Sequence, residues 1–176
     1  MALIRRLLGA VEEQDRVDGP ARAVQGAVQE ARRGPAGVRV AEVLRGSWLG
    51  HPAHPLLVQL PIGAWLSAAV LDMVPGGQDA ARRLVGVGLL AAPAAAAAGL
   101  AETSDLDVRQ RRVAAVHALA NGTAVLCYLG SYACRRAGRA RAGRGLALLG
   151  LTAVAAGGAL GGHLAYSQGA GVHRWK

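Results

Sequence analysis

Four apolar runs dominate the sequence and restrict what the chain can fold into. They cover residues 56–74, 84–100, 113–134 and 146–166. A hydrocarbon core about 30 Å thick is crossed by roughly 17 to 25 helical residues, so the length of each run matches a membrane-spanning helix. We therefore predict an all-α fold, a four-helix transmembrane bundle, with helices over residues 55–74, 84–101, 112–134 and 145–166.

The composition also favours a membrane protein. Of the 176 residues, 52% are hydrophobic and 18% are charged, and the mean hydropathy is +0.27, which is too apolar for an ordinary soluble domain. The net charge of +9 would suit a nucleic-acid-binding protein, but aromatic residues, which would stack on bases, make up only 3% of the chain. The arginines instead flank the apolar runs, where lipid headgroups would meet them. The expected partner is the lipid bilayer and not nucleic acid.

Residues 1–45 form a polar segment ahead of the membrane domain, which covers residues 46–176. The segment is broken at Gly19-Pro20 and Gly34-Pro35. It lacks the uninterrupted apolar region of about 7 to 15 residues that a signal peptide has. Apolar residues near its start recur at helical spacing, which predicts an amphipathic helix, either on the membrane surface or in solvent.

Histidines in the spanning runs are the main candidates for function, because ionisable side chains are costly to bury in lipid. Four crossings return both termini to one side of the membrane, here called side A. At 1.5 Å per residue, His117 lies roughly 7 to 8 Å from side A and His163 roughly 5 Å. His54 begins the first helix on that side, where Glu102 and Asp105 follow the second. The sequence therefore predicts a polar, histidine-lined site near one membrane face.

Two kinds of ligand suit this predicted site. The helix faces of His117 and His163 carry mainly small residues, and two imidazoles across a narrow gap resemble a bis-histidine pocket for haem b in a helix bundle. In this hypothesis His117 and His163 face one another as the primary ligands. His54 is the next candidate, and Asn121 helps to orient His117. The alternative is a transition-metal site with ligands drawn from His54, His117, His163, Glu102 and Asp105.

Catalytic motifs of the common enzyme classes are missing from the sequence. It contains no Walker loop, no GxSxG, no HExxH and no GxGxxG between a strand and a helix. Three functions therefore stay open. They are electron transfer through a bound haem or metal, metal handling or transport, and an accessory or structural role without a cofactor.

Three motifs carry a family resemblance. They are GHPAHPLLVQLPIGAW at residues 50–65, VHALAN at 116–121 and GGHLAY at 161–166. The chain resembles, over roughly residues 46–173, a bacterial membrane family known as domain of unknown function 2231. The resemblance implies four membrane helices. Because some relatives continue into a Rieske-type iron-sulfur domain, it also implies redox work with a separate iron-sulfur partner. Relatives often have His where this chain has Gln59, so we do not expect a ligand at that position.

The distribution of basic residues does not decide the orientation in the membrane. Arginines and lysines near the helix ends number seven on each side. The N-terminal segment is polar, carries further arginines and lacks an export signal. We therefore expect side A, with both termini, to face the cytoplasm of a bacterial inner membrane.

Overall fold

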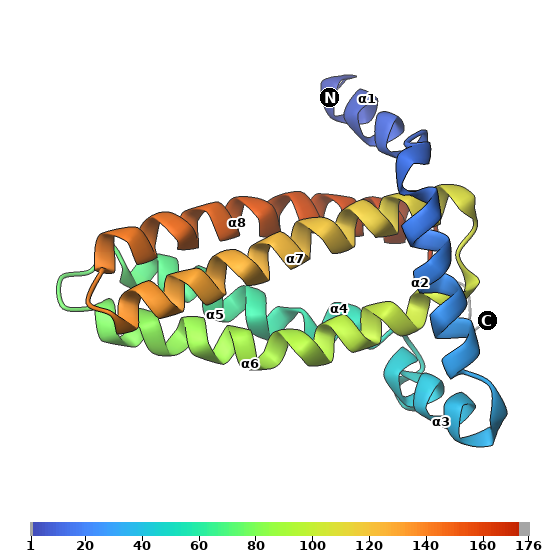
Figure 1. The fold of residues 1–176 in the computed structure, drawn as a ribbon, viewed down its shortest axis with the longest axis horizontal. Helices are drawn as coiled ribbons and strands as arrows, with labels where there is room; N and C mark the ends of the chain where they lie inside the picture. Colours follow the sequence, from blue (N-terminus) through green and yellow to red (C-terminus); the bar gives the residue numbers. More distant parts are fainter. Residues whose placement is uncertain (1, 173–176) are drawn as a thin grey trace. The chain divides into compact units, whose positions relative to one another are not determined.

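The computed structural model describes residues 2–172, and the described residues are mainly helical (Figure 1). Four stretches are long and apolar enough to cross a membrane, namely His54–Leu71, Gln78–Asp105, Val108–Arg136 and Ala140–Ser167. They contain the helices α4 (His54–Leu57), α5 (Gln59–Leu71), α6 (Gln78–Glu102), α7 (Val108–Arg136) and α8 (Ala140–Gly162). The prediction of an all-α protein with four spanning helices is confirmed.

The helices begin earlier than the apolar runs do. The predicted starts at residues 84, 112 and 145 become 78, 108 and 140 in α6, α7 and α8. The added turns contain arginines, which a helix accommodates easily where it leaves the hydrocarbon core. The first spanning stretch is interrupted at Val58, between α4 and α5. Pro61 explains this interruption, because it lacks the N–H that would bond to the carbonyl group of Leu57.

The chain divides into two compact units, which we describe separately. Unit 1 comprises Met1–His54, Ala96–Leu119 and Gly157–Lys176, and unit 2 comprises Pro55–Ala95 and Ala120–Ala156. Helices α6, α7 and α8 each contribute residues to both units. The polar N-terminal segment therefore belongs to the same unit as the side-A ends of the predicted spanning helices.

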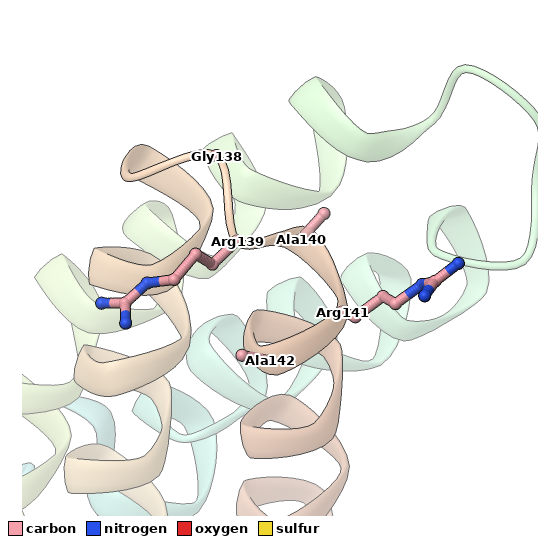
Figure 2. Close-up of a pocket in the computed structure, with 5 residues that line it drawn as sticks. All are labelled: Gly138, Arg139, Ala140, Arg141 and Ala142. Atoms are coloured by element: carbon pink, nitrogen blue, oxygen red, sulfur yellow. The ribbon is translucent and has the colours of Figure 1, made fainter.

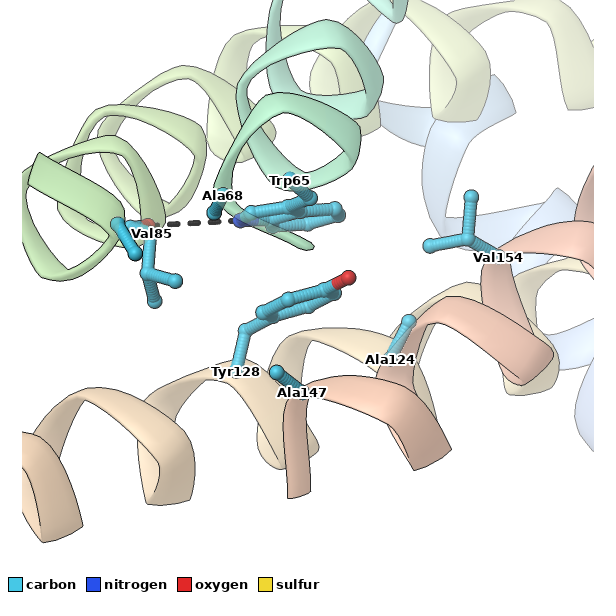
Figure 3. Packing of buried hydrophobic residues seen from close by; sticks show 8 residues of the cluster. Trp65, Ala68, Val85, Ala124, Tyr128, Ala147 and Val154 are labelled. Carbon is cyan, nitrogen blue, oxygen red and sulfur yellow. Dashed lines mark hydrogen bonds between the residues drawn. The ribbon is translucent and has the colours of Figure 1, made fainter. Parts of the chain in front are cut away.

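The core of unit 2 is a stacked aromatic pair inside a four-helix bundle (Figure 3). Trp65 of α5 and Tyr128 of α7 stack with ring centroids 4.1 Å apart and an interplanar angle of 9°. The Trp65 indole N–H donates to the Val85 carbonyl oxygen at 3.4 Å. Glycines allow this close packing, because a Cβ at Gly88 would collide with the indole and one at Gly150 would lie 2.9 Å from the Tyr128 ring. Without a hydrophobic force between helices in lipid, such close backbone approach is what holds a bundle together.

The N-terminal segment in unit 1 forms three helices, α1 (Ala2–Glu12), α2 (Asp18–Ala31) and α3 (Gly34–Arg45). The predicted helix at the start of the chain is present as α1, and its Leu7 side chain is exposed. The break at Gly34-Pro35 is also present, with Gly34 at a φ of 78° and Pro35 in the first turn of α3. The prolyl break at Gly19-Pro20 instead falls inside the first turn of α2, where proline is tolerated.

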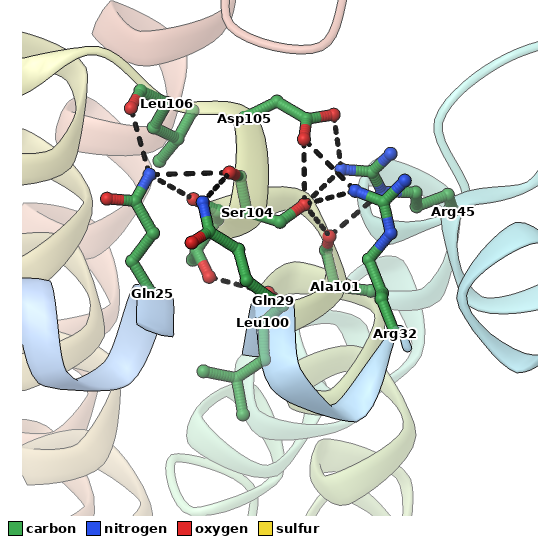
Figure 4. A network of polar contacts seen from close by, with 10 residues as sticks. Gln25, Gln29, Arg32, Arg45, Leu100, Ala101, Ser104, Asp105 and Leu106 are labelled. Carbon is green, nitrogen blue, oxygen red and sulfur yellow. Dashed lines mark hydrogen bonds and ion pairs between the residues drawn. The ribbon is translucent and has the colours of Figure 1, made fainter. Parts of the chain in front are cut away.

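Side chains of α2 and α3 cover the backbone at the end of α6 (Figure 4). The Gln25 amide donates to the carbonyl groups of Thr103 and Leu106, each at 3.0 Å, and Gln29 donates to Ser104 at 2.8 Å. The buried Arg45 side chain donates to the Ala101 carbonyl oxygen at 2.9 Å. The last carbonyl groups of a helix have no partner within the helix, and Arg45 supplies one for Ala101 of α6, whereas Gln25 and Gln29 bind carbonyl groups of the turn that follows α6. These donors also attach the N-terminal segment to the membrane domain.

Candidate functional site

Two of the predicted site histidines lie side by side in unit 1. The imidazole rings of His54 and His117 have centroids 6.1 Å apart and an interplanar angle of 76°. His54 is the first residue of α4, and His117 lies on α7. The first and third spanning stretches thus contribute one imidazole each to this pair.

The orientation of the His117 ring is set by α8. Its Nδ1–H donates to the Gly157 carbonyl oxygen at 2.8 Å. A carbonyl group can only accept, so Nδ1 carries the proton, and in a neutral imidazole the lone pair then lies on Nε2. The ring also rests on Gly161, where a Cβ would lie 3.0 Å from the ring Cε1 atom. His117 therefore contacts the side of α8 that carries Gly157 and Gly161.

The position of His54 depends on α6 and on the end of α3. Its ring lies over Gly99, where a Cβ would come within 2.9 Å of Nδ1. The preceding Ala53 N–H donates to the Arg45 carbonyl oxygen at 3.3 Å. Gly46, at a φ of 87°, makes the tight turn that brings residues 51–53 back toward α3. Gly46, Gly99 and the Arg45 carbonyl group thus help to place the His54 imidazole.

His163 contacts the N-terminal helix instead of facing His117. Its Nε2–H donates to Glu12 Oε1 at 2.6 Å, and the Gln168 amide donates to the same oxygen at 3.0 Å. The His163 hydrogen bond holds the pKa of Glu12 below its ordinary value. His117 lies against Gly161, and two helical residues turn about 200° around the axis, so His163, the first residue after α8, points to another side of the helix axis.

The two carboxylates named as metal ligands lie near the end of α6. Asp105 accepts from Arg45 at 2.6 Å and from Arg32 at 3.0 Å, so its charge is balanced by two guanidinium groups. The Glu102 carboxylate lies next to Gly171, where a Cβ would be 3.3 Å from Oε2. Among residues 2–172, no group of three or more His, Cys, Asp or Glu side chains is arranged to hold a metal ion. The five-residue metal set is therefore not assembled in this structure.

A sequence comparison connects this arrangement with a family. The model of the family described as "Predicted membrane protein (DUF2231)" matches residues 50–174. The chain belongs to this family. No curated protein and no solved structure matches the chain. The DUF2231 match includes His54, His117 and His163, whereas Glu12 and Arg45 lie before it.

Two other positions from the sequence analysis belong to unit 2. Asn121 follows His117 by one turn on α7, but it belongs to unit 2. The exposed Gln59, at which we expected no ligand, donates to the Pro55 carbonyl oxygen at 3.2 Å. The structure adds Glu12 and Arg45 to the neighbourhood of the histidines. Sequence reasoning missed both, because Glu12 lies 151 positions before its partner His163 and no local pattern connects them.

Proposed function

We propose that this DUF2231 protein is an electron-transfer component of the bacterial inner membrane in which His54 and His117 bind one transition-metal centre. The observation that carries this proposal is the pair of imidazole rings with centroids 6.1 Å apart. Imidazole binds iron, copper and zinc in proteins. A metal atom bound at about 2.0 to 2.1 Å by each of two nitrogens would place those nitrogens no more than about 4 Å apart, which two adjacent rings can provide.

The hydrogen bond from His117 to Gly157 supports the assignment. Histidines that bind metals usually donate their second ring N–H to a carbonyl or carboxylate group, which fixes the tautomer and the direction of the ligand lone pair. His117 makes such a bond through Nδ1 at 2.8 Å. A bound iron or copper ion would supply a one-electron couple. A separate iron-sulfur protein is the electron-transfer partner that the family resemblance implies.

Haem and a bare ion make different demands on this pair. Haem would use His54 and His117 as axial ligands on either side of a flat macrocycle. Both rings, however, already lie directly on helix backbone, at Gly99 and Gly161. A porphyrin between them would require the helices to separate, whereas a single ion needs only small side-chain rotations. The geometry therefore favours a bare transition-metal ion over haem b.

A cofactor-free accessory role is the second candidate. It is favoured by the bonds of His163 to Glu12 and of Asp105 to Arg45, which use predicted ligands to hold the N-terminal segment in place. Under this hypothesis the His54 and His117 rings only pack against neighbouring helices, and Gly99 and Gly161 provide the space for them. The experiment described next separates the two candidates.

The metal content of the purified protein tests the proposal. We expect the full chain in detergent, reconstituted with iron, copper or zinc and then desalted, to retain one metal atom per chain. His54→Ala and His117→Ala should each lose it. His51→Ala is the matched control, because this exposed histidine lies three residues from His54 and should leave the metal in place. A reduced-minus-oxidised visible spectrum that depends on both ligands would instead identify haem.

The outcomes of this experiment assign the function. A retained metal that changes oxidation state supports electron transfer, and a retained metal that is redox-inert supports metal handling or transport. A wild-type chain that retains no metal and shows no haem spectrum would contradict both, and the accessory role would then stand.

We also propose that both termini lie in the cytoplasm. The polar N-terminal segment attached to the end of α6 supports this orientation, because its many polar groups would all have to cross the bilayer otherwise. Reporter fusions at residue 1 and after Lys176 should both report a cytoplasmic location. Fusions that both report the side of the membrane opposite the cytoplasm would reverse the assignment.

A further inference from the structure

Unit 2 carries its charge at one end only. Its charged residues are seven arginines and two aspartates, and all of them lie in residues 72–83 or 135–144, where the predicted spanning stretches begin or end. The rest of unit 2, within residues 55–71, 84–95, 120–134 and 145–156, has no charged side chain. This end of the unit therefore combines a dense positive charge with the boundary of a hydrocarbon-facing surface.

Both aspartates are already paired with arginines. Asp72 accepts two hydrogen bonds from Arg135, at 2.7 and 2.5 Å, and lies 3.6 Å from Arg144. Asp79 pairs with Arg82 at 3.3 Å. These pairs use all of the negative charge in unit 2, so none is left to balance the other arginines.

Four arginines stay exposed at this end, and we call them the arginine surface: Arg83, Arg136, Arg139 and Arg141. Among residues 2–172, none of these four lies within ion-pairing distance of a carboxylate. Arg139 and Arg141 line an open hollow whose other residues are Gly138, Ala140 and Ala142 (Figure 2). In Figure 2 the two arginine side chains point away from one another, and the small side chains between them leave room for a bulky anionic group.

Exposed apolar side chains adjoin the arginines along the chain. Met73 is 77% exposed, and Leu148 and Leu149 are 60% and 62% exposed. Met73 follows Asp72 directly, and Leu148 and Leu149 follow Arg144 by about one helical turn. Guanidinium groups and exposed apolar side chains therefore occur at the same end of the unit. A molecule that satisfies both must carry an anionic head and an apolar tail.

We propose that the arginine surface binds the phosphate headgroups of anionic phospholipids. Arginine binds phosphate through a planar fork of N–H donors and is less strongly hydrated than lysine. Each basic residue near an anionic bilayer surface favours binding by about fivefold. This inference does not depend on the metal site, since all four arginines belong to unit 2 and neither His54 nor His117 does.

Lipid binding by the full chain in detergent tests this proposal. Phosphatidylglycerol and phosphatidylcholine with identical acyl chains would be titrated separately and bound lipid counted by native mass spectrometry. We expect a clear preference for phosphatidylglycerol that decreases as salt is raised, because exposed charges are screened. The combined substitutions Arg83→Gln, Arg136→Gln, Arg139→Gln and Arg141→Gln should reduce the affinity for phosphatidylglycerol about tenfold or more and leave that for phosphatidylcholine unchanged.

The matched control removes four exposed arginines from unit 1, through the substitutions Arg16→Gln, Arg22→Gln, Arg39→Gln and Arg109→Gln. This variant has the same net charge and should keep the preference for phosphatidylglycerol. Equal binding of both lipids by the wild type, or an equal loss in the two variants, would overturn the proposal. Displacement of phosphatidylglycerol from these four arginines by a short RNA would also overturn the proposal. If the fourfold variant does not fold, the pair Arg139→Gln and Arg141→Gln should still reduce the affinity measurably.

Discussion

The ion pair between Asp72 and Arg135 offers a sharp test of how unit 2 is held together. The two side chains are only 11% and 3% exposed, and they are joined by two hydrogen bonds. Arg135 Nε also donates to Ser131 Oγ at 3.1 Å, and Ser131 donates to the Gly143 carbonyl oxygen at 2.6 Å. The pair therefore connects the end of α5 to α7, and Ser131 connects α7 to the first turn of α8.

We predict that Asp72→Ala lowers the free energy of unfolding by about 3 to 5 kcal/mol. Removing one partner of a buried pair leaves an uncompensated charge, and this cost exceeds the net contribution of the intact pair. Asp79→Ala is the matched control. Its pair with Arg82 is 3.3 Å long and Asp79 is 84% exposed, so we expect a loss of about 0 to 1 kcal/mol.

The measurement is equilibrium unfolding in mixed detergent micelles, followed by the fluorescence of the tryptophans. The double variant Asp72→Ala with Arg135→Met should recover most of the loss, because no charge is then left buried without a partner. Equal losses for Asp72→Ala and Asp79→Ala would refute the argument. A double variant no more stable than Asp72→Ala alone would also refute it.

Three further predictions concern packing, pH and the N-terminal segment. Gly88→Val should prevent the Trp65 ring from stacking and lower the thermal midpoint by several degrees, because a Cβ there would overlap the indole. Since His163 lowers the pKa of Glu12 below 4.5, this pair should stabilise the attachment of α1 fully above pH 4.5 and lose that effect as the pH falls through the lowered value. Hydrogen exchange in α1 measures this, and faster exchange at higher pH beyond the intrinsic rate would contradict it. Arg45→Ala should make residues 101–106 more accessible to limited proteolysis, and unchanged cleavage would show that its bonds are dispensable.

The imidazole pair shows how far the sequence predicts the site. Residue counting along the spanning runs predicted that His54, His117 and His163 lie near one membrane face. It did not predict which rings meet, because that depends on how each helix is rotated and on which small residues let a ring approach. The structure pairs His117 with His54 over Gly161 and Gly99, and pairs His163 with Glu12.

The arginines show the same limit for electrostatics. The sequence places seven of them at the ends of the runs in unit 2 and cannot distinguish one from another. The structure pairs Arg82 and Arg135 with aspartates and leaves Arg139 and Arg141 exposed. Whether a guanidinium group is paired depends on which distant segment the fold brings next to it. Asp72 and Arg135, for example, are 63 positions apart in the chain.

The sequence by itself determined that this chain has four spanning helices, because crossing a bilayer requires a minimum length of apolar residues, and length and polarity are properties of a continuous segment. It also determined the family, through motifs that surround the histidines. The tertiary structure alone decided the partners of those histidines, the bonds of Gln25 and Arg45 to the backbone at and after the end of α6, and the stacking of Trp65 on Tyr128. These contacts join residues far apart in the chain, and the ring contacts depend on glycines that let side chains and helix backbones approach closely.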